Sequence, residues 1–542
     1  MTYQKQYESW LSSEFLTEIE KNELSRLTDN KEIEERFCAP LSFGTAGLRG
    51  IAEMGLNRLN RFTLCQAVRA YGKHISGRGA VVVCRDARLS SLGLSRVAAC
   101  ALAELGIDVV YFEDARPTPQ LSFAVRHLGA AGGINVTASH NPKEYNGCKF
   151  YDKSGAQLGN DDTDRISLIM KDTPLLSPAP EKSFEEYLAE GKITYAECDE
   201  AYIQAVLDCR IDADLLKDSD LKVVYTAFHG VGGSIMPEVL RRAGLEQVYL
   251  QSEQMIPDGR FPTLKNPNPE ASDGFALSEK LAREKGADII CATDPDADRA
   301  AVSVRNGKGG YTPLSGNQTG VLLSDYLLKN KNAEKCPAII KTIVSTPLTD
   351  AICSYYGAEC FSTFTGFKNM AEKLEEIENT HTCLMCYEES IGYMIGSHVR
   401  DKDGISAILL ICEMAAYYKK QGKTLLDALE DIYAIHGRFE EYTANIYRPG
   451  LEGQAEIKQM MVYLRNTPPT QLDGLKVEVI GDYLTGTNTH ISGSDVLEFR
   501  LQGGSRVLVR PSGTEPKIKI YALARNHQAK ALTDAIGKEL GL

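Results

Sequence analysis

The sequence predicts an α/β protein of several domains, and three features of the chain indicate this. The chain has 542 residues, and a single core rarely serves more than about 250–300 residues, so we expect three or four domains. Short runs of β-branched residues alternate with longer helical patterns, which is typical of largely parallel sheets covered by helices. After about Tyr442 shorter strands and turns take over. This change indicates a small α+β domain at the end of the chain.

Three segments open in a similar way. Residues 80–91 (AVVVCRDARLSS), 221–233 (LKVVYTAFHGVGG) and 337–348 (PAIIKTIVSTPL) each predict a buried strand, a turn and the start of a helix. The likeness suggests three related α/β units, although the identity is too low to establish a repeat. A polar helical stretch, 181–207, separates the first unit from the second, and 315–336 leads into the third.

The last segment, 526–542, predicts an amphipathic helix. From these features we expect domains at residues 1–205, 206–320, 321–440 and 441–542. Long linkers rich in Pro, Gly or Ser are absent from the sequence, so the domains are expected to pack against one another.

Composition and charge exclude several classes of protein. The chain is 43% hydrophobic, 25% charged and 8% aromatic, which does not fit a disordered, collagenous or coiled-coil protein. The chain contains 60 Lys and Arg and 73 Asp and Glu, which gives a net charge of −13. It therefore lacks the positive field that holds a nucleic acid. No apolar run approaches the roughly 18 residues of a membrane span, and the start has no secretion signal. We expect a soluble, cytoplasmic protein with no membrane partner.

The 14 cysteines are scattered and often lie in apolar, strand-like runs. Without a secretion signal, this pattern favours buried free thiols over a disulfide framework. One CxxC pair, Cys383 and Cys386, has His381 nearby. It has no second pair to complete four ligands, so a zinc or redox role is not expected for it.

The first motif with chemical potential is TASHNP, residues 137–142. Ser139 stands where a strand breaks into a turn, and His140 and Lys149 are close enough in sequence to supply protons and positive charge. An ordinary Asn/Pro turn is the alternative interpretation. The GxSxG pattern of an acyl-transfer elbow is missing.

The second motif is DPDADR, residues 294–299, directly after the strand-like GADIICAT. Three carboxylates at alternate positions repel one another unless a divalent cation lies among them. A calcium loop of the EF-hand type fits poorly, because its sixth position needs Gly and is Arg299, and its twelfth needs Glu and is Arg305. Mg²⁺, which keeps open positions for water and phosphate, fits better. A solvated acidic turn is the alternative.

Two further loops look suited to a polar ligand. In YEES, residues 387–390, the side chains of Glu388, Glu389 and Ser390 emerge at a strand end, where open α/β sheets bind their ligands. In RPSGTEPKIKIY, residues 510–521, an Arg, two hydroxyls, glycine-freed amides and two Lys make a cradle for a phosphate dianion. Each loop would also pass as a surface turn. Neither a P-loop nor a GxGxxG fingerprint is present.

Taken in order, TASHNP, DPDADR, the EES loop and RPSGT resemble the phosphoserine, metal, sugar and phosphate loops of the α-D-phosphohexomutases. The resemblance spans nearly the whole chain, from FGTAGLRG at Phe43 to RPSGTEPK. FGTAGLRG, GNQTG at Gly316 and VRDKDG at Val399 are most similar to the branch that contains phosphoglucomutases and phosphopentomutases. The resemblance implies four domains around one cleft, three similar mixed-sheet α/β domains and a smaller α+β domain.

The resemblance also implies roles for individual residues. Ser139 would carry the phosphoryl group, and a phosphoserine oxygen would bind Mg²⁺ together with Asp294, Asp296 and Asp298. The implied catalytic residues are Ser139, His140, Lys149, Arg49 and Arg299. The implied substrate-binding residues are Thr45, Thr365, Gly366, Glu388, Ser390, Lys402, Arg510, Ser512, Gly513, Thr514 and Lys519.

The implied activity is that of a phosphoglucomutase, with Mg²⁺ as cofactor, glucose 1,6-bisphosphate as intermediate and activator, and a small sugar phosphate as its partner. A phosphopentomutase, a phosphomannomutase, a glucose 1,6-bisphosphate synthase, a phosphatase and a noncatalytic scaffold relative are the alternatives. The run SerIleGlyTyr, with Tyr393 where many relatives place a His, leaves the sugar preference open.

Overall fold

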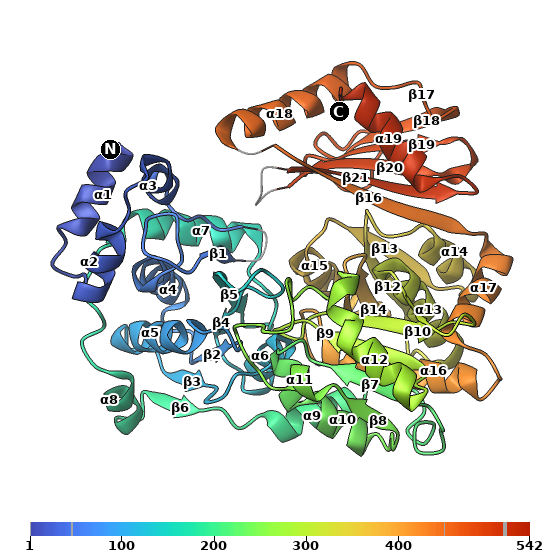
Figure 1. Ribbon diagram of the computed structural model, residues 1–542, viewed down its shortest axis with the longest axis horizontal. Coiled ribbons are helices and arrows are strands. Elements are labelled where there is room, and N and C mark those ends of the chain that lie inside the picture. Colours follow the sequence, from blue (N-terminus) through green and yellow to red (C-terminus); the bar gives the residue numbers. More distant parts are fainter. Residues whose placement is uncertain (1, 45–46, 449, 513–516, 542) are drawn as a thin grey trace.

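Four β-sheets follow one another along the chain, each with its own helices (Figure 1). This computed structural model describes residues 2–44, 47–448, 450–512 and 517–541. The first three sheets mix parallel and antiparallel strands between helices, and the fourth is antiparallel throughout. The predicted fold class, three α/β domains followed by a smaller α+β domain, is therefore confirmed.

The first sheet has the strand order β1-β5-β4-β2-β3-β6, and β5 runs antiparallel to both of its neighbours. Its strands are β1 (Leu48–Ile51), β2 (Val81–Arg85), β3 (Val109–Tyr111), β4 (Gly132–Val136), β5 (Tyr145–Asp152) and β6 (Ile193–Tyr195). Its helices are α1 (Tyr3–Leu11), α2 (Glu18–Ser25), α3 (Asn30–Phe37), α4 (Arg61–Ile75), α5 (Ser91–Glu104), α6 (Thr118–His127), α7 (Asn160–Lys171) and α8 (Phe184–Ala189).

Local sequence explains these elements. The first four residues of β2 are buried, which accounts for an apolar run without alternation in a sheet covered on both faces. Helix α4 begins at Arg61 because the Asn60 side chain accepts hydrogen bonds from the amides of Phe62 and Thr63 and caps it. The stretch 181–207, expected to be helical, instead contains β6 between two helices. Its β-branched and aromatic residues pair in parallel with β3 at the sheet edge.

The second sheet has the order β11-β10-β9-β7-β8, with β7, β8 and β9 parallel. Its strands are β7 (Val223–Thr226), β8 (Val248–Leu250), β9 (Ile289–Thr293), β10 (Ala300–Arg305) and β11 (Tyr311–Pro313). Its helices are α9 (Asp199–Leu207), α10 (Met236–Arg242), α11 (Ser252–Met255) and α12 (Ala276–Lys285), with short 3-10 helices η1 (Val231–Ser234) and η2 (Ser272–Phe275).

The third sheet has the order β13-β12-β14-β15, with β12, β13 and β14 parallel. Its strands are β12 (Cys336–Thr342), β13 (Glu359–Thr363), β14 (His381–Glu388) and β15 (Gly392–Ile395). Its helices are α13 (Gly316–Asn330), α14 (Leu348–Tyr356), α15 (Phe367–Ile377), α16 (Gly404–Lys419) and α17 (Leu425–His436). Because α13 packs on α14 and β14, we propose that the third domain begins near residue 315 rather than at 321.

Helix α16 joins the second and third domains into one body. It packs against β9 and β10 of the second sheet and against β15 of the third, and almost every residue in it is buried. A helix that is apolar all round belongs in a core rather than on a surface. The two domains accordingly share one continuous hydrophobic cluster, which fixes the loops at the ends of β9 and β14 relative to each other.

The fourth sheet has the order β16-β21-β20-β19-β18-β17. Its strands are β16 (Phe439–Tyr447), β17 (Gln471–Leu472), β18 (Leu475–Asp482), β19 (Leu497–Leu501), β20 (Arg506–Pro511) and β21 (Lys517–Arg525). Its helices are α18 (Gly450–Asn466), α19 (Ala529–Glu539) and the 3-10 helix η3 (Gln502–Gly504). Figure 1 shows this domain, in orange and red, above the third domain. A small apolar cluster joins the two, in which Ile343 and Val344 meet Leu508 and Tyr521.

Two general expectations can be compared with the structure. All fourteen cysteines are free, and most are buried, as the sequence predicted. Among the residues described, no helix combines the length and the apolar character that crossing a membrane requires.

Candidate active site

Ser139 lies in the loop that follows β4, at the carboxyl edge of the first sheet. Only 2% of its surface is exposed, and its backbone is left-handed, with φ 50°. Its hydroxyl donates a 2.7 Å hydrogen bond to Asp294 Oδ2 and lies 3.1 Å from His140 Nδ1. A serine held this way presents its oxygen directly to the acidic loop of the second domain.

The DPDADR loop follows β9 and brings its three carboxylates together. One oxygen from each of Asp294, Asp296 and Asp298 lies within 4.8 Å of the others, and all three residues are buried. Burial, reinforced by the other two carboxylates, raises the pKa of Asp294 well above its usual value. For Asp298, burial acts in the same direction, but the charges of Lys149 and Lys402 hold its pKa below the usual value.

Two carboxylate oxygens in this loop make the cluster suitable for a metal. Asp296 Oδ1 and Asp298 Oδ1 are buried and have no hydrogen-bond partner among the residues that the structure describes. Leaving a buried carboxylate oxygen without a partner costs on the order of 1–3 kcal/mol of stability or more. A hard, oxygen-binding cation such as Mg²⁺ would satisfy both oxygens. The donor set therefore fits the predicted metal.

Two lysines lie against the same cluster. Lys149 Nζ, on β5, is 2.8 Å from Asp296 Oδ2 and 2.8 Å from Asp298 Oδ2. Lys402 Nζ lies 3.3 Å from Asp298 Oδ2 and 3.3 Å from Asp401 Oδ1. Lys402, which the resemblance places among the substrate-binding residues, thus also contacts the metal loop. The ammonium groups offset the buried negative charge through the Oδ2 atoms, and within the described part of the chain the Oδ1 atoms of Asp296 and Asp298 keep no hydrogen-bond partner.

The other predicted catalytic residues surround Ser139. Burial, with the positive charges of Arg299 and Arg49, lowers the pKa of His140 well below its usual value, so its imidazole is neutral. Arg49 Nη1, on β1, donates to Asn141 Oδ1 at 3.0 Å. Arg299 directly follows the carboxylates, and its Nη1 donates to Glu270 Oε2 at 3.2 Å.

The predicted sugar loop follows β14 at the carboxyl edge of the third sheet. Glu388 is buried, and its Oε1 accepts a 2.7 Å hydrogen bond from the amide of Gly366. Gly366 has φ 106°, a conformation that favours glycine, and it places Thr365 in the turn before α15. Ser390, next in the loop, is half-buried. The structure thus brings the predicted residues from two loops of the third domain together.

The predicted phosphate loop comes from the fourth domain. Arg510 on β20 pairs in register with Lys519 on β21, so their side chains share one face of that sheet. Burial lowers the pKa of Lys519, and the nearby charge of Glu389 in the sugar loop opposes this effect. The backbone amide of Ser512 donates to Lys517 O at 2.8 Å. The predicted residues Thr45, Gly513 and Thr514 lie outside the described residues.

Backbone contacts join the loops of the first three domains. Thr118 N donates to Asp296 O at 2.9 Å across the first and second domains. Arg299 and Gly392 form a bridge between the metal and sugar loops. Three non-glycine residues in these loops, Ser139, Ala297 and Ile391, have φ between 50° and 56°. Left-handed backbone at non-glycine residues is strained and tends to gather at active sites.

Comparison with known proteins agrees with this geometry. Four protein-family models match the chain, one after another. Three describe the alpha/beta/alpha domains I, II and III of phosphoglucomutase/phosphomannomutase and match residues 40–175, 200–309 and 315–435. The fourth describes the C-terminal domain of the same family and matches residues 461–535. The chain belongs to the phosphoglucomutase/phosphomannomutase family.

Individual members of the family match over nearly the full length. The phosphoglucomutase of Staphylococcus aureus (strain MRSA252) is 35% identical over 509 residues, which cover 90% of this chain and 91% of its own. A putative phosphomannomutase from Thermus thermophilus has a TM-score of 0.71 at 25% identity and covers 93% of this chain and 100% of its own. An open-form parafusin from Paramecium has the same fold, with a TM-score of 0.71 at 22% identity over 92% and 94% of the two chains.

The structure shows a residue in this family member that sequence reasoning missed. Arg88, buried in the turn after β2, donates to four carbonyl oxygens of the Ser139 loop. Those oxygens belong to Ser139, Asn141, Pro142 and Tyr145. Arg88 Nε also lies 3.2 Å from Asp86 Oδ2. The available signal is CRDARLS, a charged turn after an apolar strand, which by itself indicates only the opening of an α/β unit.

A second group links the Lys402 loop to its surroundings. Asp401 Oδ2 accepts hydrogen bonds from Tyr151 and Gln157 of the first domain. Asp403 Oδ1 accepts one from Tyr202 of α9. Because these partners are more than two hundred residues away in sequence, no local pattern could reveal them.

The departure at Tyr393 does not alter the site's lining. Tyr393 is fully buried, stacks on Tyr387 and donates a 3.1 Å hydrogen bond to Gly316 O. Its side chain therefore belongs to the core beneath the sugar loop. Gly392, just before it, leaves room for the Lys402 side chain, because a Cβ at position 392 would lie 2.4 Å from Lys402 Cδ.

Proposed function

We propose that this chain is a phosphoglucomutase that interconverts glucose 1-phosphate and glucose 6-phosphate through a phosphoserine at Ser139. The observation that carries this proposal is the 2.7 Å hydrogen bond from Ser139 to Asp294, in a carboxylate cluster with two partnerless buried oxygens among the described residues. The family membership and the curated phosphoglucomutase relative support it.

Asp294, Asp296 and Asp298, with an oxygen of the phosphorylated serine, would hold Mg²⁺. The bound ion would neutralise charge on the phosphoryl group. Arg299 and Lys149 add positive charge to the same place, because phosphorylation brings about −1.5 to −2 charges to a buried serine.

In the first half of the reaction, the 6-hydroxyl of glucose 1-phosphate attacks the phosphorus of phosphoserine. The bond from phosphorus to Ser139 Oγ breaks, the proton of the 6-hydroxyl passes to Oγ, and glucose 1,6-bisphosphate forms. The sugar then turns over, and Ser139 Oγ attacks the phosphorus at the 1-position. The bond from that phosphorus to the 1-oxygen breaks, and the 1-oxygen takes up the serine proton, which releases glucose 6-phosphate. His140, neutral and 3.1 Å from Oγ, is placed to share the serine proton in this second half.

The remaining loops hold the sugar in both orientations. Glu388 and Ser390, with Thr365 and Gly366, would bind the ring hydroxyls. Arg510 and Lys519, with Ser512, would bind the phosphate that is not reacting. Phosphoryl transfer depends chiefly on positioning and charge neutralisation, so these groups contribute by alignment rather than by bond making.

The test is formation of glucose 6-phosphate from glucose 1-phosphate with Mg²⁺ and a trace of glucose 1,6-bisphosphate. We expect turnover by the native chain and loss of turnover in Ser139→Ala. Ser154→Ala, which changes a serine elsewhere in the first domain, should keep the native rate. Mass spectrometry should find phosphate on Ser139 after incubation with the bisphosphate. Activity retained in Ser139→Ala would contradict the proposal, and faster turnover of mannose 1-phosphate or ribose 1-phosphate would reassign the substrate.

A further inference from the structure

Three side chains with metal-binding atoms meet at the amino-terminal edge of the third sheet. Cys336 on β12 lies directly opposite His381 on β14. Glu359 on β13 lies opposite Ala338, two residues along β12 from Cys336. Because side chains two residues apart on a strand share a face, all three project from the same face of the sheet.

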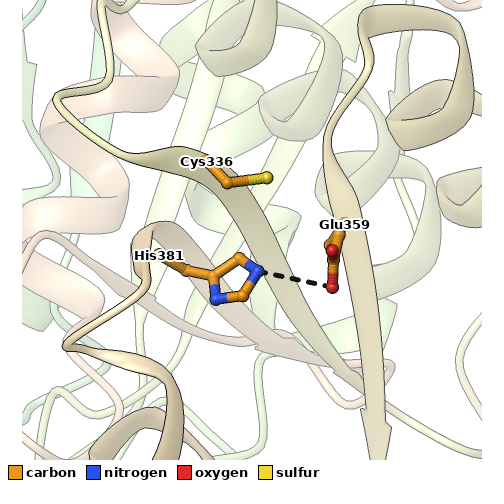
Figure 2. Close-up of side chains that lie close together, drawn as sticks. All are labelled: Cys336, Glu359 and His381. Atoms are coloured by element: carbon orange, nitrogen blue, oxygen red, sulfur yellow. Dashed lines mark ion pairs between the residues drawn. The ribbon is translucent and has the colours of Figure 1, made fainter.

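Their ligand atoms are close enough to share one ion. The Cys336 sulfur, one imidazole nitrogen of His381 and one carboxylate oxygen of Glu359 all lie within 4.8 Å of one another. His381 Nε2 is 3.3 Å from Glu359 Oε2. Figure 2 shows the sulfur, the imidazole edge and the carboxylate turned toward a common space. Ligand atoms that share one metal, each at about 2.0–2.3 Å from it, are separated from one another by distances of the same order as those between these three side chains.

A neighbouring hydroxyl orients the imidazole. Thr380 Oγ1 is 3.1 Å from Ile377 O, which can only accept, so the hydroxyl donates its single proton there. The same oxygen lies 2.8 Å from His381 Nδ1 and can then accept the proton of Nδ1. In that tautomer the lone pair is on Nε2, the nitrogen that lies 3.3 Å from Glu359 Oε2 and would bind the ion. A hydrogen-bond acceptor on the other ring nitrogen is the usual arrangement around a metal-bound histidine.

The donor set indicates which ion fits. A thiolate, an imidazole nitrogen and a carboxylate oxygen together favour Zn²⁺ over Mg²⁺, which prefers oxygen ligands alone. Cys336 and Glu359 are exposed, so a water molecule can complete a tetrahedron. We propose that Cys336, Glu359 and His381 form a zinc-binding site that is separate from the carboxylate cluster of the second domain.

The position of this site indicates a structural role. The three strands run parallel, and the sugar loop leaves the carboxyl end of β14 at Glu388, seven residues after His381. At about 3.3 Å per residue, the two ends of β14 are on the order of 20 Å apart. A bound ion would tie together the amino ends of three neighbouring strands without touching the reacting phosphate. We therefore expect Zn²⁺ to stabilise the third domain.

The test uses the full chain, reduced with a phosphine and held in excess Mg²⁺ so that the carboxylate cluster is occupied. Calorimetric titration with Zn²⁺ should give one ion per chain and a higher Tm. Titration with Co²⁺ should give the absorption band of a cobalt–thiolate bond. Cys336→Ser and His381→Gln should abolish the band and the Tm shift, and Thr380→Val should weaken binding about 10–100-fold.

Matched variants separate this site from other thiols. Cys38→Ser, at the other strongly exposed cysteine, and Cys383→Ser, on β14 itself, should keep both the band and the Tm shift. Mutase activity with Mg²⁺ should persist in Cys336→Ser, which shows that this variant folds. Zn²⁺ binding equal in the native chain and Cys336→Ser would overturn the proposal and leave only a contact between His381 and Glu359. A band lost in Cys383→Ser but kept in Cys336→Ser would overturn it as well.

Discussion

The proposed reaction centre around Ser139 and the fourth domain, which we propose binds the distal phosphate, are held in very different ways. At the centre, Lys149 of the first domain, Asp298 of the second and Lys402 of the third are joined by buried ion pairs. The fourth domain meets the third through a small apolar cluster around Ile343 and Tyr521. It offers Arg510 and Lys519 from the face of a sheet that belongs to that domain alone.

This difference matches the two tasks of the proposed reaction. Transfer of a phosphoryl group requires fixed positions for the nucleophile and for positive charge, which a buried network supplies in advance. The distal phosphate, by contrast, must be bound when the sugar lies in either orientation. We therefore expect changes at the centre to lower kcat, and changes in the fourth domain to raise KM or alter stability.

The largest effect is expected for Asp296→Asn. The change removes one charge from the carboxylate cluster but keeps a side chain of the same shape, with an oxygen that can accept from Thr118. Mg²⁺ should bind far more weakly, and kcat should fall on the order of 1,000-fold or more, because the ion supplies several kcal/mol of charge stabilisation. Steady-state kinetics over a range of Mg²⁺ concentrations would measure this.

The control for that variant is its fold. Lys149 keeps its 2.8 Å contact with Asp298, so the thermal unfolding curve should remain a single transition near that of the native chain. Activity within about tenfold of native would show that Asp296 is not part of the metal site.

The next effect is expected for Arg88→Lys. Lysine keeps the charge beside Asp86 but cannot donate to four carbonyl oxygens in fixed directions. The Ser139 loop should lose its alignment, and kcat should fall about 100-fold while KM changes little. Arg85→Lys, at the end of the strand before the Arg88 turn and bonded to backbone carbonyls away from the Ser139 loop, is the matched control. An equal loss in both variants would contradict a positioning role for Arg88.

These two residues also show what sequence reasoning could and could not predict. Asp296 could be predicted as a metal ligand because three carboxylates within five positions repel one another, and this repulsion can be inferred from the sequence alone. The strand, turn and helix openings were equally visible, because buried strands have a distinctive composition. Both predictions rest on neighbours in sequence.

The parts that were missed rest on contacts between distant segments. Arg88 contacts the Ser139 loop more than fifty residues later, and α16 is covered by two different sheets. The strand β6 was missed because three residues give too little periodicity to outweigh the helices on either side. Tertiary packing decided these features, and it leaves little trace in local composition.

On the other side of the comparison, Lys519→Met should raise the KM for glucose 1-phosphate about 10–100-fold with a smaller change in kcat. A charge-assisted hydrogen bond to a phosphate is worth about 1.5–3 kcal/mol, and methionine fills the half-buried site without the charge. Lys530→Met removes an exposed lysine of α19 in the same domain and should leave KM unchanged. A fall in kcat with constant KM would place Lys519 in the chemical step instead of in binding.

The smallest effect tests the joint between the third and fourth domains. Glu441 on β16 accepts hydrogen bonds from Asn317 and Ser315 of the third domain, and burial raises its pKa from 4.5 to about 7. Below pH 4.5 the carboxyl is protonated in both the folded and the unfolded chain. As the pH rises toward 7 the unfolded chain loses this proton first, so ionisation favours unfolding, and the penalty becomes constant above about pH 7.

Glu441→Gln lacks this penalty while keeping an oxygen that can accept from Asn317. Its free energy of unfolding should therefore rise relative to the native chain by about 1–2 kcal/mol between pH 5 and pH 8, which calorimetry at the two pH values would measure. Glu478→Gln, at an exposed position of β18, controls for the loss of one charge in the same domain. If the two variants show the same pH dependence, the joint does not hold a protonated carboxyl. The fourth domain would then be attached through its apolar cluster and through hydrogen bonds to an ionised carboxylate, and the contrast with the charged reaction centre would be weaker.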